Sequence, residues 1–312
     1  MLQKTPTQLQ GVIEGIAHVV IDAPDLAHAK GFYESVLGLQ AVGSDMVPAA
    51  KNSRSATLKL PSGQLVTLVE TQPLNDLHIS PAHQAYAVTT QGRDKIAATL
   101  ATQGITLHRF HEDRPAEAAD NYYFDDPAGN RIQLVTKPTG GVGADAIDHV
   151  ALETHNIHWA REFYGTWLSC PVDHRVGWMT QDYLSAKALG EAGMAAAMPG
   201  SRYWNERYSK FEKERKALRP NVQVYFNLGR DNCLAVYLAS RKYQAPQDDQ
   251  IVGAPRIALR TSRKALDSIA TFFGERGRTV EGPVEHDRKQ PIAASVYVKD
   301  PGGNFLEFCA LR

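Results

Sequence analysis

Histidine, carboxylate and amide side chains recur at matching places along this chain. His18, His83 and His149 each stand on a short apolar run that is typical of a β-strand. Gln133 and Glu307 each follow an Asp-Pro-x-Gly-Asn turn, on a run whose alternate side chains face opposite sides. Two imidazoles and one carboxylate on adjacent strands can bind one face of a divalent metal, which leaves open positions for a substrate with two neighbouring oxygens. These residue types therefore indicate metal chemistry wherever the fold brings such a set together.

The candidate residues lie in four repeated units. The segment that begins at Ile16 is matched by the one that begins at Ile147, with the same spacing from its histidine to a Phe-Tyr pair. The segment that begins at His83 is matched by the one that begins at Arg256, and each ends on the Asp-Pro-x-Gly-Asn strand. An internal repeat of a whole strand and helix is stronger evidence for a fold than any single motif. We expect four βαβββ modules, named A, B, A′ and B′ in chain order, that begin at these four residues.

A glycine-rich stretch over 137–145 separates module B from module A′ and is the expected domain linker. We therefore expect one two-module domain over 1–138 and a second over 139–312. Module A′ carries an insertion at roughly 179–220 with a basic, aromatic segment. This segment is either a surface helix with one buried stripe, or a lid or partner-docking helix at the mouth of a site.

Charge and cysteine content limit the classes of function. Lys plus Arg and Asp plus Glu number 34 each, so no global field recruits nucleic acid or an anionic membrane, and a small-molecule substrate fits better. The 3 cysteines show no CxxC spacing, which argues against a disulfide framework and suits a reducing compartment. No apolar run approaches the length of a membrane span. We expect a cytoplasmic protein, and the sequence leaves open a homodimer.

Modules with histidine on a first strand and a carboxylate or amide on a last strand resemble the vicinal oxygen chelate superfamily. That superfamily includes glyoxalase I, fosfomycin-resistance proteins, methylmalonyl-CoA epimerase and the type I extradiol ring-cleaving dioxygenases. The resemblance covers about 16–136 and 147–312. It implies an α+β fold in which paired modules curl into two cup-like open barrels. It also implies a divalent metal, Fe(II) or Mn(II), with ligands from the first strands of two modules and the last strand of at least one.

In the N-terminal half, the resemblance implies His18, His83 and Gln133 as metal ligands, with Tyr123 and His111 beside them as catalytic residues. Gln133 offers an amide oxygen where an anionic ligand would bind a cation more tightly. The alternative is that the two histidines only line a pocket.

In the C-terminal half, His149 and Glu307 match the family positions, but Arg256 stands where the second histidine would be. Arginine stays protonated and cannot coordinate a metal. We predict either an ion pair between Arg256 and Glu307 or a bidentate grip by Arg256 on a substrate carboxylate, in a substrate site shared with His149. Tyr297, just ahead of the turn, matches a catalytic-site tyrosine of the family.

Some members of the superfamily pair their modules crosswise, and the sequence leaves this open. Pairing B with A′ would unite His83, Gln133 and His149. Pairing A with B′ would unite the other set, His18, Arg256 and Glu307.

Three hypotheses for function follow from this resemblance. The first is a metal-dependent enzyme on a small, oxygen-bearing aromatic substrate, most like an extradiol-type dioxygenase. The second is a glyoxalase-like lyase or isomerase, which needs metal but no O₂. The third is a non-catalytic small-molecule binding protein with degenerate metal sites, whose ligand binding a chelator would not affect.

Overall fold

The structure is a computed structural model of the 312-residue chain. It describes residues 8–44, 46–47, 53–73, 82–110, 121–176, 223–238 and 250–312. The insertion expected at 179–220 and the candidate residue His111 lie outside the described residues.

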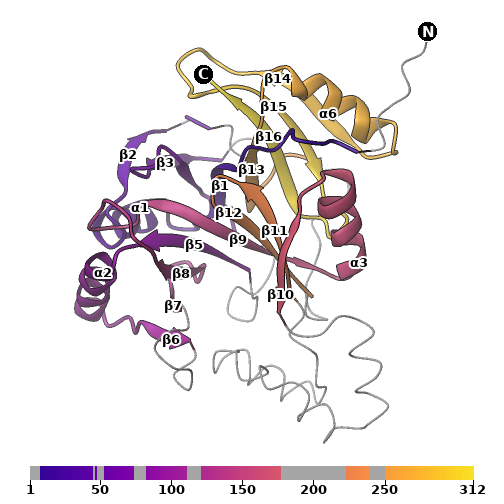
Figure 1. Cartoon of the computed structure of the whole chain (residues 1–312). Helices are drawn as coiled ribbons and strands as arrows, with labels where there is room; N and C mark the ends of the chain where they lie inside the picture. Colours follow the sequence, from indigo (N-terminus) through magenta and orange to yellow (C-terminus); the bar gives the residue numbers. More distant parts are fainter. Residues whose placement is uncertain are drawn as a thin grey trace, which may run out of the picture.

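The first sheet joins modules A and B′ (Figure 1). Module A supplies β1 (Ile16–Asp22), β2 (Gln40–Gly43), β3 (Ser55–Lys59) and β4 (Leu65–Val69). Module B′ supplies β13 (Arg256–Arg260), β14 (Val280–Glu285), β15 (Ile292–Lys299) and β16 (Phe305–Leu311). The strand order is β14-β15-β16-β13-β1-β4-β3-β2, and the two modules meet where β1 pairs antiparallel with β13.

The second sheet joins modules B and A′ in the same way. Module B supplies β5 (His83–Val88), β6 (His108–Phe110), β7 (Asn121–Asp125) and β8 (Arg131–Thr136). Module A′ supplies β9 (Ala146–Thr154), β10 (Val172–Val176), β11 (Gln223–Gly229) and β12 (Asn232–Leu238). The strand order is β10-β11-β12-β9-β5-β8-β7-β6, and β5 pairs antiparallel with β9 at the seam.

The modules therefore pair crosswise, which the sequence left open. Both seams join a strand from before the 137–145 linker to a strand from after it. The expected division into 1–138 and 139–312 therefore does not describe the two sheets. The α+β class with four modules is confirmed, and each sheet is a cup-like open sheet rather than a closed barrel.

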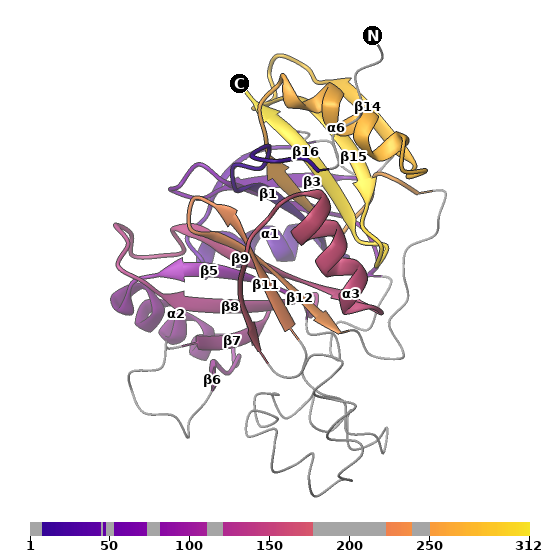
Figure 2. The same ribbon diagram turned by 45° about the vertical axis from the view of Figure 1, so that its right-hand side comes forward.

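Short helices cover one face of each sheet (Figure 2). They are α1 (Leu26–Ser35), α2 (Thr90–Thr102), α3 (Ile157–Ala160), the π-helix η1 (Arg161–Trp167) and α6 (Ala265–Gly274). In the core, Phe163 of η1 stacks on Phe273 of α6, with ring centroids 5.4 Å apart. This contact links a helix of the second sheet to a helix of the first. None of the helices in the described part of the chain is long and apolar enough to cross a membrane.

The repeated Asp-Pro-x-Gly-Asn turns hold consecutive modules together. Asp126 Oδ1 accepts hydrogen bonds from the backbone N–H groups of Ala128 and Asn130, at 2.9 and 2.8 Å. Its other oxygen accepts from the hydroxyl of Tyr33 in module A, and the Asn130 amide donates to the Asp22 carbonyl of β1. The second copy repeats these bonds with Asp300, Tyr164, Asn304 and Glu153. The turn of one module thus bonds to the tyrosine of the Phe-Tyr pair in the module before it, and both copies of the repeat use the same contact.

Candidate functional site

Crosswise pairing divides the sequence-predicted site residues between the two sheets. His83, Gln133, His149 and Tyr123 lie on strands of the second sheet. The first sheet holds the remaining set, His18, Arg256, Glu307 and Tyr297. The predicted ligand set of His18, His83 and Gln133 is therefore not brought together, because β1 pairs with β4 and β13 whereas β5 pairs with β8 and β9.

One face of the second sheet carries polar and aromatic side chains. Ala85 on β5 pairs with Gln133 on β8 and with His149 on β9, and His83 lies two residues before Ala85 on the same face. The intervening residues, such as Tyr86 on β5, point into the apolar core. We call the opposite side the polar face, defined by His83, Tyr123, Arg131, Gln133, His149, Tyr225 and Tyr237.

The two histidines of the polar face meet through their ring nitrogens. His83 Nε2 and His149 Nε2 lie 3.2 Å apart, and both side chains are buried. His149 Nδ1 lies 2.7 Å from Asp148 Oδ1, and Lys137 also pairs with Asp148. Burial opposes ionisation of Asp148, but the hydrogen bonds and charges of His149 and Lys137 outweigh it and lower its pKa. In the neutral tautomer whose Nδ1–H donates to this carboxylate, the Nε2 lone pair of His149 faces His83.

This geometry fits two ligands of one metal ion. With metal–nitrogen bonds of about 2.1 Å, two nitrogens 3.2 Å apart subtend roughly 100° at the ion, between the tetrahedral and octahedral angles. Asp148 orients His149 as outer carboxylates orient metal-bound imidazoles. Gln133 shares the face and offers an amide oxygen as a third ligand. In the described ranges no carboxylate or thiol completes a set with these histidines, so the ligand set is neutral.

Three tyrosines surround the histidine pair. The ring of His83 lies 5.7 Å from that of Tyr123 and 5.9 Å from that of Tyr237, while His149 lies 5.7 Å from Tyr225. Burial raises the pKa of all three phenols, that of Tyr225 to about 12. They therefore stay protonated at neutral pH. The Tyr225 hydroxyl donates to Gln223 Oε1 at 3.1 Å.

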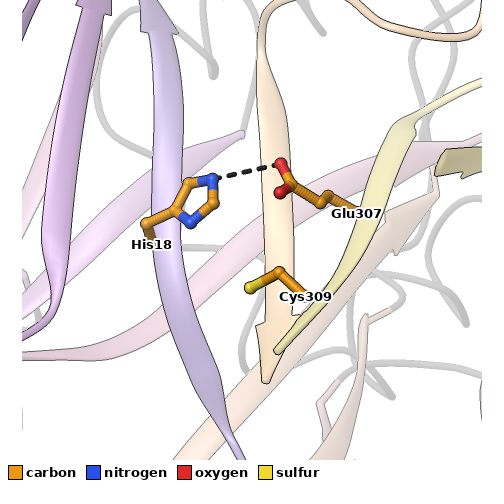
Figure 3. Close-up of side chains that lie close together, drawn as sticks. All are labelled: His18, Glu307 and Cys309. Carbon is orange, nitrogen blue, oxygen red and sulfur yellow. Dashed lines mark hydrogen bonds and ion pairs between the residues drawn. The ribbon is translucent and has the colours of Figure 1, made fainter. Parts of the chain in front are cut away.

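The first sheet holds a buried ion-pair network around Glu307, whose contact with His18 is drawn in Figure 3. Glu307 Oε2 accepts from Arg256 Nε at 2.9 Å and contacts His18 Nε2 at 3.2 Å. Glu307 Oε1 accepts from the Ser295 hydroxyl at 2.6 Å. Burial opposes ionisation of Glu307, but these neighbouring charges and hydrogen bonds outweigh it and lower its pKa to about 2. The predicted ion pair between Arg256 and Glu307 is confirmed.

Cys309 completes a second possible ligand set in that sheet. Donor atoms of His18, Glu307 and Cys309 lie within 4.8 Å of one another (Figure 3). Arg256 already occupies the carboxylate oxygen that a cation would need, and its guanidinium stays charged. Burial raises the pKa of the Cys309 thiol, which disfavours the thiolate that binds metals. These residues therefore do not fit a divalent cation as they stand.

Sequence reasoning missed several of these residues. Arg131 lies two positions before Gln133 on the same strand, so strand alternation alone places it on the same face. Asp148 directly precedes His149. No comparable signal marked Ser295, whose hydroxyl bridges Glu307 to His286 with a 2.8 Å contact to the His286 ring.

Comparisons with known proteins agree with this architecture. Residues 15–134, which cover modules A and B, match the model of the family described as Glyoxalase/Bleomycin resistance protein/Dioxygenase superfamily. Modules A′ and B′ lie outside that match but repeat the same order of elements. A proposed dioxygenase from Bacillus subtilis has 13% identity and a TM-score of 0.63, over 96% of this chain and 86% of that one. Glyoxalase I from Zea mays has 14% identity and a TM-score of 0.59, over 95% of this chain and 92% of that one.

At such identities these two structures establish the fold. The vicinal oxygen chelate superfamily contains metal-dependent glyoxalases and dioxygenases that act on small molecules. The two structures do not establish the chemistry of this chain, which depends on its own side chains.

Proposed function

We propose that the protein is a metal-dependent enzyme that acts on a small, oxygen-bearing aromatic substrate at the polar face, most like an extradiol-type ring-cleaving dioxygenase. The observation that carries this proposal is the His83–His149 pair, with its nitrogens 3.2 Å apart and one ring oriented by Asp148. His83, His149 and Gln133 would hold Fe(II) or Mn(II), so His149 replaces His18 in the ligand set. Such an ion, when bound, supplies a Lewis acid that makes loss of a proton from a substrate hydroxyl easier.

The chain's own residues supply the rest of the site. The rings of Tyr123, Tyr225 and Tyr237 surround the histidines and can pack edge-on against an aromatic substrate. Their protonated hydroxyls add polar groups beside the bound substrate. In this proposal the network of His18, Arg256, Glu307 and Tyr297 stabilises the first sheet and does not touch the substrate.

A glyoxalase-like lyase or isomerase is the second candidate, and the neutral ligand set favours it. Without an anionic ligand, a bound cation keeps its full charge to polarise a substrate oxygen, and such chemistry needs no O₂. The absence of a carboxylate ligand from the site would also be expected in a binding protein that has no catalytic activity.

Oxygen uptake separates these functions. The protein is purified anaerobically, loaded with Fe(II) or Mn(II), and given catechol or dihydroxybenzoate with the hydroxyls on adjacent carbons. We expect oxygen consumption that a chelator and His83→Ala abolish and that His155→Ala, an exposed histidine, leaves intact. Chelator-sensitive turnover without oxygen would indicate the lyase. Ligand binding that a chelator does not change, without turnover, would overturn the enzyme proposal.

A further inference from the structure

Arg131 is a buried charge that lacks partners at two of its nitrogens. It is the first residue of β8 on the polar face, and 8% of it is exposed. In the described part of the chain, neither Nε nor Nη2 has a hydrogen-bond partner. Removing a charged group from water costs several kcal/mol unless a partner compensates it. The fold therefore keeps a buried cation whose Nε and Nη2 donors have no hydrogen-bond partner among the described residues, and a bound ligand could supply one.

Nearby carboxylates do not fill this role. Asp125 is the register partner of Arg131 on β7, and Glu153 is buried on the same face of β9. Within the described ranges, Nε and Nη2 of Arg131 donate to neither of these carboxylates. Burial raises the pKa of Asp125 even though the charge of Arg131 opposes this change.

The residues beside Arg131 on this face belong to the candidate site. Gln133 lies two residues further along β8, and its register partner on β7 is Tyr123. His83 on β5 is the register partner of Arg131, so the backbones of these two residues lie about 4.8 Å apart across the sheet. Arg131 therefore lies next to the strand that carries one member of the His83–His149 pair, on the same face of the sheet.

We propose that Arg131 binds the carboxylate of the substrate, so that the substrate is an aromatic hydroxy acid and not a neutral phenol. This inference rests on the proposed function for the polar face. A planar guanidinium can donate two parallel hydrogen bonds to a carboxylate, which fixes the orientation of the ring as well as its charge. The hydroxyl end of the ring then lies over the histidine pair, among the three tyrosines.

Calorimetric binding of a matched pair of probes tests this proposal. Dihydroxybenzoate and its neutral analogue dihydroxybenzamide, both with adjacent hydroxyls, are titrated into chelator-treated protein. We expect wild type to prefer the carboxylate by about 10- to 100-fold, the range of a hydrogen bond to a charged group. Arg131→Met should lose this preference and keep its affinity for the amide. Equal binding of both probes by wild type, a preference that persists in Arg131→Met, or no binding of either probe would overturn the proposal.

Thermal unfolding excludes a merely structural role for Arg131. Arg131→Met removes a charge with unpartnered donors, so its unfolding midpoint should equal or exceed that of wild type. Arg256→Met is the matched control, because Arg256 is also buried but is bonded to Glu307, and its midpoint should fall. Equal losses in the two variants would show that Arg131 has a partner in the protein. The binding measurement requires neither metal nor turnover. It can therefore be interpreted even if the oxygen-uptake test fails.

Discussion

Replacing Glu307 with glutamine tests whether the first sheet is held by ion pairs rather than prepared for a metal. Glu307→Gln keeps the size of the side chain but leaves Arg256 and His18 without the carboxylate that both contact. The pKa of Glu307 falls from an ordinary 4.5 to about 2, which corresponds to about 3 kcal/mol in favour of the folded state at neutral pH. Removal of one partner from a buried pair costs about 3–5 kcal/mol. We therefore expect the variant to lose about 3–5 kcal/mol of unfolding free energy.

The pH dependence of this loss has a definite sign. A carboxyl group whose pKa is lowered by folding contributes stability above its unfolded pKa, and this contribution disappears as the pH falls through the folded value. The difference between wild type and Glu307→Gln should thus be constant near neutral pH and shrink as the pH drops from 4.5 towards 2.

Urea unfolding at several pH values measures this difference. Gln133→Glu is the control at the equivalent position of the second sheet. Gln133 and Glu307 are equivalent because each is the register partner of the alanine that stands third in the neighbouring strand. A loss below about 1 kcal/mol at neutral pH, the range of an exposed ion pair, would refute the reasoning. So would a difference that does not change with pH.

Two further predictions concern the polar face. Gln133→Glu adds an anionic ligand to the histidine pair, so the affinity for Mn(II) should rise at least about tenfold in calorimetric titration; an unchanged affinity would place Gln133 outside the ligand set. Asp148→Asn removes the carboxylate that orients His149, so metal affinity should fall about 10- to 100-fold while the circular dichroism spectrum is retained. Wild-type affinity in Asp148→Asn would contradict this orienting role.

The internal repeat made the fold predictable, but the pairing of its modules was not. Matching strand-helix segments and turns identified four βαβββ modules, because local apolar periodicity and turn residues determine each module. All four first strands are apolar and bear a polar residue near the same position, so each could pair with more than one partner. The choice depends on long-range packing, which one sequence does not reveal. For this reason His83, Gln133 and His149 were recognised as candidates, whereas their assembly without His18 was only one of the options.

The polar face was predictable only in part. Gln133 was predictable because it matches a ligand position of the resembled family. Strand alternation places Arg131 on the same face as Gln133, so its side could have been predicted as well. Its burial could not, because burial depends on the elements that pack around it. Tyr225 and Tyr237 lie on strands whose register with β9 could not be deduced without the partner strand. The ion pair of Arg256 and Glu307 was one of two predicted arrangements, because a guanidinium can bind either a carboxylate of the protein or one of a substrate.

Elemental analysis of protein purified without oxygen and without a chelating tag tests the central claim most directly. We predict close to one equivalent of iron or manganese per chain in wild type, loss of that metal in His83→Ala and His149→Ala, and retention in Cys309→Ser, which alters only the set in the first sheet. Absence of metal from wild type even after Fe(II) or Mn(II) is added would contradict the account. Retention by His83→Ala with loss in Cys309→Ser would place the metal in the other sheet.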